Sequence, residues 1–270
     1  MPTILSLIKL AILSARKRAQ LLFLLAVMAG LISSITLTPS VLLMEDIQDT
    51  VADAGEGQLN EASLIEMFAD GIGTLTGGYI AFLVTIGALI PFWARASSPL
   101  HIQPWDGDRS AYARRAVLSF VHLLTATALS LLVLIILLLF TGAIGAALGG
   151  PNSFLIIVVI TAMIWANILF SATANIAIIA ASTDRKLPFA VAFSHIRLFM
   201  RPAVGSLAVF LFLSLIIENI FGSVIHGLVD GKNSAMLTSF VRGAIAFLST
   251  ALHISVLENI PALSSRARQD

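Results

Sequence analysis

Residues 197–258 read RLFMRPAVGSLAVFLFLSLIIENIFGSVIHGLVDGKNSAMLTSFVRGAIAFLSTALHISVLE, and this stretch decides the fold class. It holds two apolar runs, Ala203–Leu228 and Ala235–Leu257, separated by a short turn at Val229–Ser234. Each run exceeds the ~18 residues that indicate a membrane-spanning helix. The stretch therefore predicts a hairpin of two antiparallel spans, and the same pattern recurs earlier in the chain.

The composition of the whole chain is that of a membrane protein. Of its 270 residues, 58% are hydrophobic and only 11% are charged, and the mean hydropathy is +0.96. A soluble domain of this length needs far more polar surface to cover its core. The chain contains no Cys, which excludes disulfides, thiolate metal sites and cysteine nucleophiles.

Six apolar runs are long enough to cross a bilayer, so we predict an all-α, polytopic membrane helical bundle. The predicted spans are 21–44, 72–94, 116–148, 154–181, 203–228 and 235–257. We expect residues 1–270 to form a single integral membrane domain.

The first two spans carry three local predictions. Pro39 lies among Ser and Thr residues, whose hydroxyls can satisfy the backbone groups that a proline frees, so we expect a kink there. Gly73 and Gly77, four residues apart, favour the close approach of another helix. Trp93 lies near the end of its span, where interfacial aromatic residues are common.

Two basic, partly amphipathic segments precede spans. Residues 182–202 predict an interfacial helix on the cytoplasmic side, because their apolar residues recur at helical spacing between basic ones. Residues 1–20 predict either a second helix of this kind or the frayed start of the first span.

Lys and Arg are concentrated on one side of the predicted bundle. Segments 1–20, 95–115, 182–202 and 259–270 contain 14 of the 16 basic residues. The positive-inside rule places these segments, and both termini, in the cytoplasm. We therefore expect a multi-pass protein of a bacterial-type inner membrane.

Residues 45–70 form the longest predicted loop, and they contain eight acidic and no basic residues. Clustered carboxylates can bind Ca²⁺ or Mg²⁺. The loop has no D-x-D-x-D-G motif, and an acidic outward-facing loop is ordinary, so cation binding is left open.

A weak internal repeat links the last hairpin to the one before it. Shifting residues 132–153 by 81 positions places them on 213–234 and aligns Leu, Ile and Phe residues with a shared G-x-N-S turn. We infer three parallel hairpin repeats, at about 1–95, 96–185 and 186–270. They differ from the inverted repeats that many secondary transporters contain.

The segment AFSHIRLF at 192–199 is a basic lead-in to an apolar span, and similar lead-ins recur along this six-span chain. This layout resembles the membrane domain attached to some glycerophosphoryl diester phosphodiesterases and its stand-alone relatives. The resemblance spans most of the chain and includes no catalytic motif. It implies a membrane module, and it does not imply hydrolysis, because the soluble phosphodiesterase domain is not among these residues.

Two charges, Glu218 and Arg242, lie inside the last two predicted spans. At ~1.5 Å per residue both lie about 10 Å below the same membrane surface. A lone charge near the bilayer centre costs ~2.5–3.5 kcal/mol, so we expect the two to form an ion pair. The pair is either a clamp that fixes the register of the two helices or part of a proton or ion relay.

Other polar side chains extend the candidate site. Asn167, Ser171 and Asn175 recur every fourth residue and so share one face of the fourth span, where they either line a solute path or bond to other helices. Asn219 and His226 lie near Glu218 and could enlarge its polar patch. His122 and His253 are expected to be interfacial residues rather than ligands.

Motifs for catalysis and for cofactor binding are missing from the sequence. It contains no phosphate-binding glycine loop, no zinc-protease motif and no nucleophile elbow. We therefore predict no enzyme activity, no catalytic or metal site and no cofactor. The expected partners are membrane lipids, anionic headgroups at the cytoplasmic face, and a protein partner or a second copy of the chain; nucleic acid is not expected.

Two functions follow as hypotheses. The first is a non-enzymatic inner-membrane protein that serves membrane organisation, lipid interaction or the support of a partner complex. The second is a transporter or channel subunit that moves a small solute along a polar path through the fourth to sixth spans. A membrane enzyme acting on lipid is a third alternative.

Overall fold

The computed structural model describes residues 3–53, 61–98, 103–148, 153–198, 200–229 and 231–260. These residues are almost entirely helical, and no strand occurs among them. The helices are α1 (Ile4–Lys17), α2 (Ala19–Thr36), α3 (Thr38–Asp53), α5 (Glu61–Ser97), α6 (Arg109–Leu148), α7 (Ser153–Ser182), α8 (Phe189–Leu198), α9 (Met200–Leu228) and α10 (Gly231–Glu258). Six of them are long and apolar enough to cross a membrane, which confirms the predicted all-α, six-span bundle.

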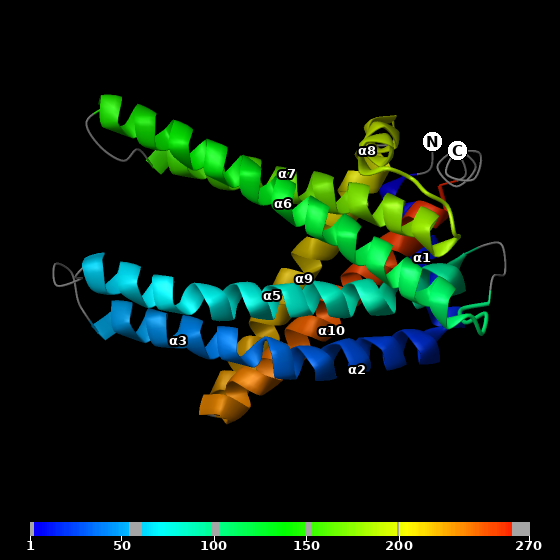
Figure 1. Ribbon diagram of the computed structural model, residues 1–270, viewed down its shortest axis with the longest axis horizontal. Coiled ribbons are helices and arrows are strands. Elements are labelled where there is room, and N and C mark those ends of the chain that lie inside the picture. Colours follow the sequence, from blue (N-terminus) through cyan, green and yellow to red (C-terminus); the bar gives the residue numbers. More distant parts are fainter. Residues whose placement is uncertain are drawn as a thin grey trace.

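Consecutive spans lie side by side as three pairs, which we call the first pair (α2 and α3 with α5), the second pair (α6 with α7) and the third pair (α9 with α10). In addition, α2 of the first pair packs closely along α10 of the third. Figure 1 shows α1 and α8 at one end of the bundle, which we call the terminal end. From there the second pair diverges from the first, and the third pair crosses behind them. That the three pairs repeat one unit stays a prediction.

The first predicted span is broken where a kink was expected. α2 ends at Thr36 and α3 begins at Thr38. Pro39 lies in the first turn of α3, where its missing N–H is tolerated. Nearby hydroxyls bond to backbone carbonyls of the preceding turn, as Ser34 Oγ does to the Leu31 oxygen at 2.7 Å.

The predicted acidic loop at 45–70 is wrong for the part that the structure describes. α3 continues to Asp53 and α5 begins at Glu61, so the helices extend well beyond the apolar runs. Acidic residues do not stop a helix, and Leu64, Ile65 and Phe68 recur at helical spacing. Residues 54–60 lie outside the described part of the chain.

The turn between the last two spans is shorter than predicted. α9 ends at Leu228 and α10 begins at Gly231, whose φ of +58° suits glycine. Residues 231–234, expected to belong to the turn, form the first turn of α10. The matching segment 149–152 lies outside the described residues, so the shared turn stays a prediction.

The N-terminal segment forms a helix of its own rather than the start of the first span. α1 is separated from α2 at Arg18. Leu7 and Ala11 are fully buried in a core cluster with residues of α7, α9 and α10, whereas Leu5 and Ile12 are exposed. α1 thus has one face packed on the bundle and one apolar face free for lipid. The predicted helix in 182–202 is α8.

Small residues bring the first and last spans into close contact. A Cβ atom on Gly243 of α10 would lie 2.1 Å from Ser33 Oγ of α2, and one on Gly30 would lie 2.7 Å from the Phe240 ring. The close approach predicted at Gly73 and Gly77 is wrong within the single chain, because no atom lies within 4 Å of an added Cβ at either position. Both glycines are on an exposed face of α5.

Candidate functional site

An open groove of about 810 Å³ lies among the three helix pairs and includes several of the predicted site residues. Apolar side chains make most of its walls, and Tyr79, Asn167, Glu218 and Arg242 bring polar groups to it. The groove is lined by Leu37, Ser40, Val41, Met44, Leu75, Thr76, Tyr79, Phe82, Leu131, Asn167, Glu218, Arg242 and Ala246. All three pairs therefore contribute to one site.

A second cavity of about 370 Å³ adjoins the groove between α5, α6 and α7. It shares Tyr79, Leu131 and Asn167 with the groove. The Tyr79 hydroxyl lies 3.3 Å from Thr127 Oγ1, so one hydrogen bond links α5 to α6 between the two cavities. Together the cavities separate the outer part of the second pair from the first.

The structure brings Glu218 and Arg242 together at the groove. Arg242 Nε lies 3.7 Å from Glu218 Oε2, across the two helices of the third pair. This distance is longer than a hydrogen bond, and neither side chain has a hydrogen bond to the described residues. The Arg242 side chain is 52% exposed and that of Glu218 26%. The pair is therefore loose and leaves hydrogen-bonding groups of both residues free toward the groove.

A small cavity of about 20 Å³, which we call the lobe, lies beside this pair. It is lined by Glu218, Gly222, Ile225, Thr238, Val241 and Arg242. Thr238 Oγ1 is buried there without a hydrogen-bond partner among the described residues. The lobe thus places a third polar group, the Thr238 hydroxyl, beside the carboxylate and the guanidinium group.

The predicted polar stripe on α7 divides between two environments. Asn167 is exposed and lines the groove, and Ser171 Oγ lies 3.4 Å from its Oδ1. Asn175 is buried in the core, where its Nδ2 lies 2.8 Å from His253 Nδ1 of α10. The stripe therefore does not form a continuous polar surface.

His253 is a buried link between three helices, and the prediction of an interfacial histidine is wrong. Its Nε2 lies 2.8 Å from the Ala203 carbonyl oxygen, which can only accept a hydrogen bond. A neutral ring that donates from Nε2 accepts at Nδ1, so Asn175 is the donor there. These two bonds connect α7, α9 and α10. Trp93, also predicted to be interfacial, is fully buried and donates to the Ala251 carbonyl at 2.7 Å.

The two neighbouring polar residues do not enlarge the groove. Asn219 is exposed and its Nδ2 donates to the Leu215 carbonyl of its own helix at 2.7 Å. His226 lies 2.9 Å from Ser234 Oγ and 3.9 Å from a Glu45 oxygen, so it connects the third pair to α3. Neither residue is among those that line the groove.

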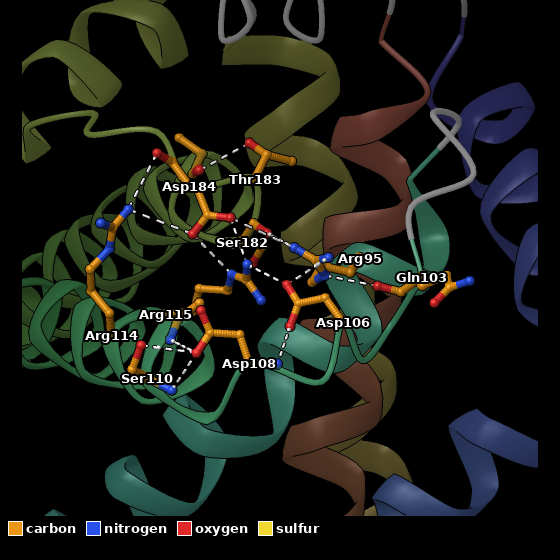
Figure 2. A network of polar contacts seen from close by, with 12 residues as sticks. Arg95, Gln103, Asp106, Asp108, Ser110, Arg114, Arg115, Ser182, Thr183 and Asp184 are labelled. Atoms are coloured by element: carbon orange, nitrogen blue, oxygen red, sulfur yellow. Dashed lines mark hydrogen bonds and ion pairs between the residues drawn. The ribbon is translucent and has the colours of Figure 1, made fainter.

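A network of Arg and Asp at the terminal end was not predicted as a site (Figure 2). Arg115 of α6 binds both carboxylate oxygens of Asp184, at 3.0 Å from Nε and 2.6 Å from Nη2. It also reaches Asp106 at 2.7 Å, and Arg95 of α5 contacts the same carboxylate at 3.2 Å. Arg95 donates further to the Ser182 carbonyl at 3.2 Å, so the network joins the ends of α5, α6 and α7.

Charge and burial explain how this network holds. The two arginines are nearly buried, with side chains 8% and 4% exposed for Arg95 and Arg115, whereas the aspartates are partly exposed. The hydrogen bond from Arg115 keeps the pKa of Asp106 below its ordinary value. Backbone N–H groups at the start of α6 do the same for the pKa of Asp108, which caps that helix. The arrangement supports a structural tie rather than proton transfer.

The sequence contains a signal for this network, which the prediction of membrane orientation uses only in part. Basic residues in 95–115 and 182–202 were assigned to the cytoplasmic side, although acidic residues stood among them in the same two loops. Pairing of Arg115 with Asp184, 69 residues away, required the two helices of the second pair to end side by side. Loop composition does not contain that spatial information.

Neither a metal-binding cluster nor a similarity to known proteins gives further information about this site. Within the described ranges, no group of three or more His, Cys, Asp or Glu side chains could hold a metal ion. No known protein family, curated protein or solved structure matches the chain. The chemistry of the groove and of the network is therefore all that bears on function.

Proposed function

We propose that this multi-pass membrane protein is non-enzymatic and holds a lipid-like amphiphile in the groove among its three helix pairs. The observation that carries the proposal is the lining of the groove, where apolar walls surround the loosely paired Glu218 and Arg242. Its volume of about 810 Å³ lies within the ~300–1,000 Å³ range of ligand sites. An amphiphile places its chain on such walls and its head at the charges.

The divergence of the helix pairs supports entry from the bilayer. Many large apolar side chains in the outer part of α6 are exposed, and Leu139 is 71% exposed, so lipid must already cover this surface. Leu131 of the same helix lines the groove, which is open. A lipid molecule can therefore move sideways into the groove without leaving the hydrocarbon.

The proposed location is a bacterial-type inner membrane, with the terminal end in the cytoplasm. The terminal end holds the network of Arg and Asp. Exposed basic side chains lie in the last turn of α1 (Arg16 and Lys17) and just after α7 (Lys186), where they would attract anionic headgroups. Single cysteines at Asp49 and Lys186 test this in the otherwise Cys-free chain. A membrane-impermeant thiol reagent added to intact cells should label position 49 only, and labelling of position 186 alone would reverse the proposed orientation.

The layout that resembles the membrane domain of some glycerophosphoryl diester phosphodiesterases fits a lipid-handling module. It contributes no residue to the proposal, because no catalytic motif carries the resemblance. Hydrolysis is not proposed.

Transport of a small solute is the second candidate, and the charged pair in the groove favours it. The buried end of the polar stripe argues against transport. Asn175 is hydrogen-bonded to His253 there, and both residues are buried in the core. Replacing Glu218 and Arg242 together by Gln separates the roles. If the pair only clamps the two helices, the double variant should keep much of the protein's stability. If the pair lies on an ion path, the double variant should lose solute uptake while its protein level is unchanged.

Native mass spectrometry of the detergent-purified protein tests the proposal. The wild type should retain about one phospholipid molecule, and filling the groove with Ala246→Trp or Thr76→Trp should release it. The matched control is Leu139→Trp, which adds the same ring on an exposed face of α6 and should leave the bound lipid in place. Equal lipid retention in all four proteins would contradict the proposal.

A further inference from the structure

We infer that the amphiphile in the groove carries a zwitterionic head, in which an anionic phosphate-type oxygen stands next to a primary ammonium group. This inference rests on the proposed function and adds the chemical class of the ligand. It follows from the free hydrogen-bonding groups of Arg242, Glu218 and Thr238, and from the size of the lobe between them.

The free donors of Arg242 favour an anionic oxygen in the ligand. Its guanidinium group has five N–H donors, and none forms a hydrogen bond to the described residues. Arg242 is 16 residues from the end of α10 at Glu258, which is ~24 Å along the helix and places it inside the span. Donors in the hydrocarbon region must be satisfied, and Arg242, whose side chain is 52% exposed, lines the groove. Phosphate oxygens match the planar fork of a guanidinium group.

The size of the lobe and its hydrogen-bond acceptors favour a small, positively charged donor group in the ligand. Glu218 brings a carboxylate to it and Thr238 Oγ1 brings a buried hydroxyl. Neither group has a hydrogen bond to the described residues, so both can accept one. A volume of about 20 Å³ is enough for one water-sized group. A primary ammonium group fits this space and supplies three donors. A trimethylammonium group is too large for the lobe and has no N–H to donate.

Electrostatics favours the zwitterion over a purely anionic head. Glu218 and Arg242 are only 3.7 Å apart, so an anion that approaches Arg242 also approaches the Glu218 carboxylate. Repulsion between like charges is costly in a medium of low dielectric constant. An ammonium group on the neighbouring atoms of the ligand removes that repulsion and leaves the occupied site neutral. A glycerol head offers hydroxyl donors but no such compensation.

The test is a competition in mixed micelles that contain equal amounts of phosphatidylethanolamine, phosphatidylcholine and phosphatidylglycerol with identical dioleoyl chains. Native mass spectrometry then counts each lipid on the full chain. We expect the ethanolamine lipid to exceed each of the others about tenfold, which corresponds to ~1.4 kcal/mol. Glu218→Gln should abolish this preference while lipid still binds, and Arg242→Gln should reduce binding of all three lipids.

Three controls make the outcomes distinct. Asp46→Asn removes an exposed carboxylate that does not line the groove, and it should keep the preference. Soluble phosphoethanolamine in excess should displace no lipid, and displacement would show that the site takes the free zwitterion instead. Equal binding of the three lipids that is still lost in Ala246→Trp would overturn the head-group inference alone. Retention of lipid that Ala246→Trp does not change would overturn both the inference and the proposed function.

Discussion

Arg115 holds both carboxylate oxygens of Asp184, at 3.0 and 2.6 Å, although 69 residues separate them along the chain. One residue lies near the start of α6 and the other just after the end of α7, so the contact fixes the second pair at its terminal end. Asp106 and Arg95 extend the contact to α5. The same pair diverges from the first at its other end, where the groove opens (Figure 1). We regard this network as the anchor that allows the divergence.

Replacement of Arg115 by Lys should destabilise the protein more than replacement of Arg114 by Lys. Lys keeps the charge but cannot bind a carboxylate through two parallel N–H groups, so Arg115→Lys should lower the free energy of unfolding by about 2 kcal/mol. Arg114 is 53% exposed and lies 3.5 Å from Asp184, so its substitution should cost little. Thermal unfolding in detergent provides the comparison, and equal losses for the two variants would refute the anchor.

Two asparagines on α7 provide a matched test of the buried link. Asn175→Leu should lower the free energy of unfolding by ~1–3 kcal/mol, because His253 Nδ1 loses its donor inside the core. Asn167→Leu makes the same change at the groove. There the amide is bonded only to Ser171 of its own helix among the described residues, so this substitution should be nearly neutral. Thermal unfolding of both proteins decides. A larger loss for Asn167→Leu would place the structural role in the groove instead.

Two glycines, one at a packed helix contact and one on an exposed face, provide a matched test of helix packing. Gly243→Leu should destabilise the protein by ~1–3 kcal/mol or more, since even a Cβ atom there would lie 2.1 Å from Ser33 Oγ. Gly77→Leu should not destabilise the protein, because nothing lies within 4 Å of a Cβ atom added there and Leu favours a helix more than Gly does. Size-exclusion chromatography should be run alongside thermal unfolding. Loss of a dimer in Gly77→Leu would assign the Gly73-xxx-Gly77 face to contact between two copies.

The sequence predicts the six spans well because hydrophobic length is a local property. The break near Pro39 and the α8 helix are local in the same sense and were also expected. The charge of residues 45–70 predicts a loop, and this prediction is wrong because α3 and α5 continue beyond their apolar parts. Composition indicates where a membrane ends more reliably than where a helix ends.

The site could be predicted only in part, for a physical reason. Glu218 and Arg242 meet because they are placed symmetrically about a short turn, which the sequence shows directly. Asn175 with His253 and Arg115 with Asp184 join helices that are distant in the chain. These contacts depend on how the pairs pack, as does the groove among them. No pattern within one span contains that information.

Crosslinking with a photoactivatable phospholipid is the most direct test of whether the groove binds lipid. The protein is reconstituted in vesicles that contain the lipid, irradiated, and digested for mapping by mass spectrometry. If the groove holds lipid, crosslinks should be concentrated on groove residues such as Ser40, Thr76 and Ala246, and they should be lost when Ala246 is replaced by Trp. Crosslinks that simply follow exposure, with most of them on the outer face of α6 around Leu139 and none in the groove, would contradict it.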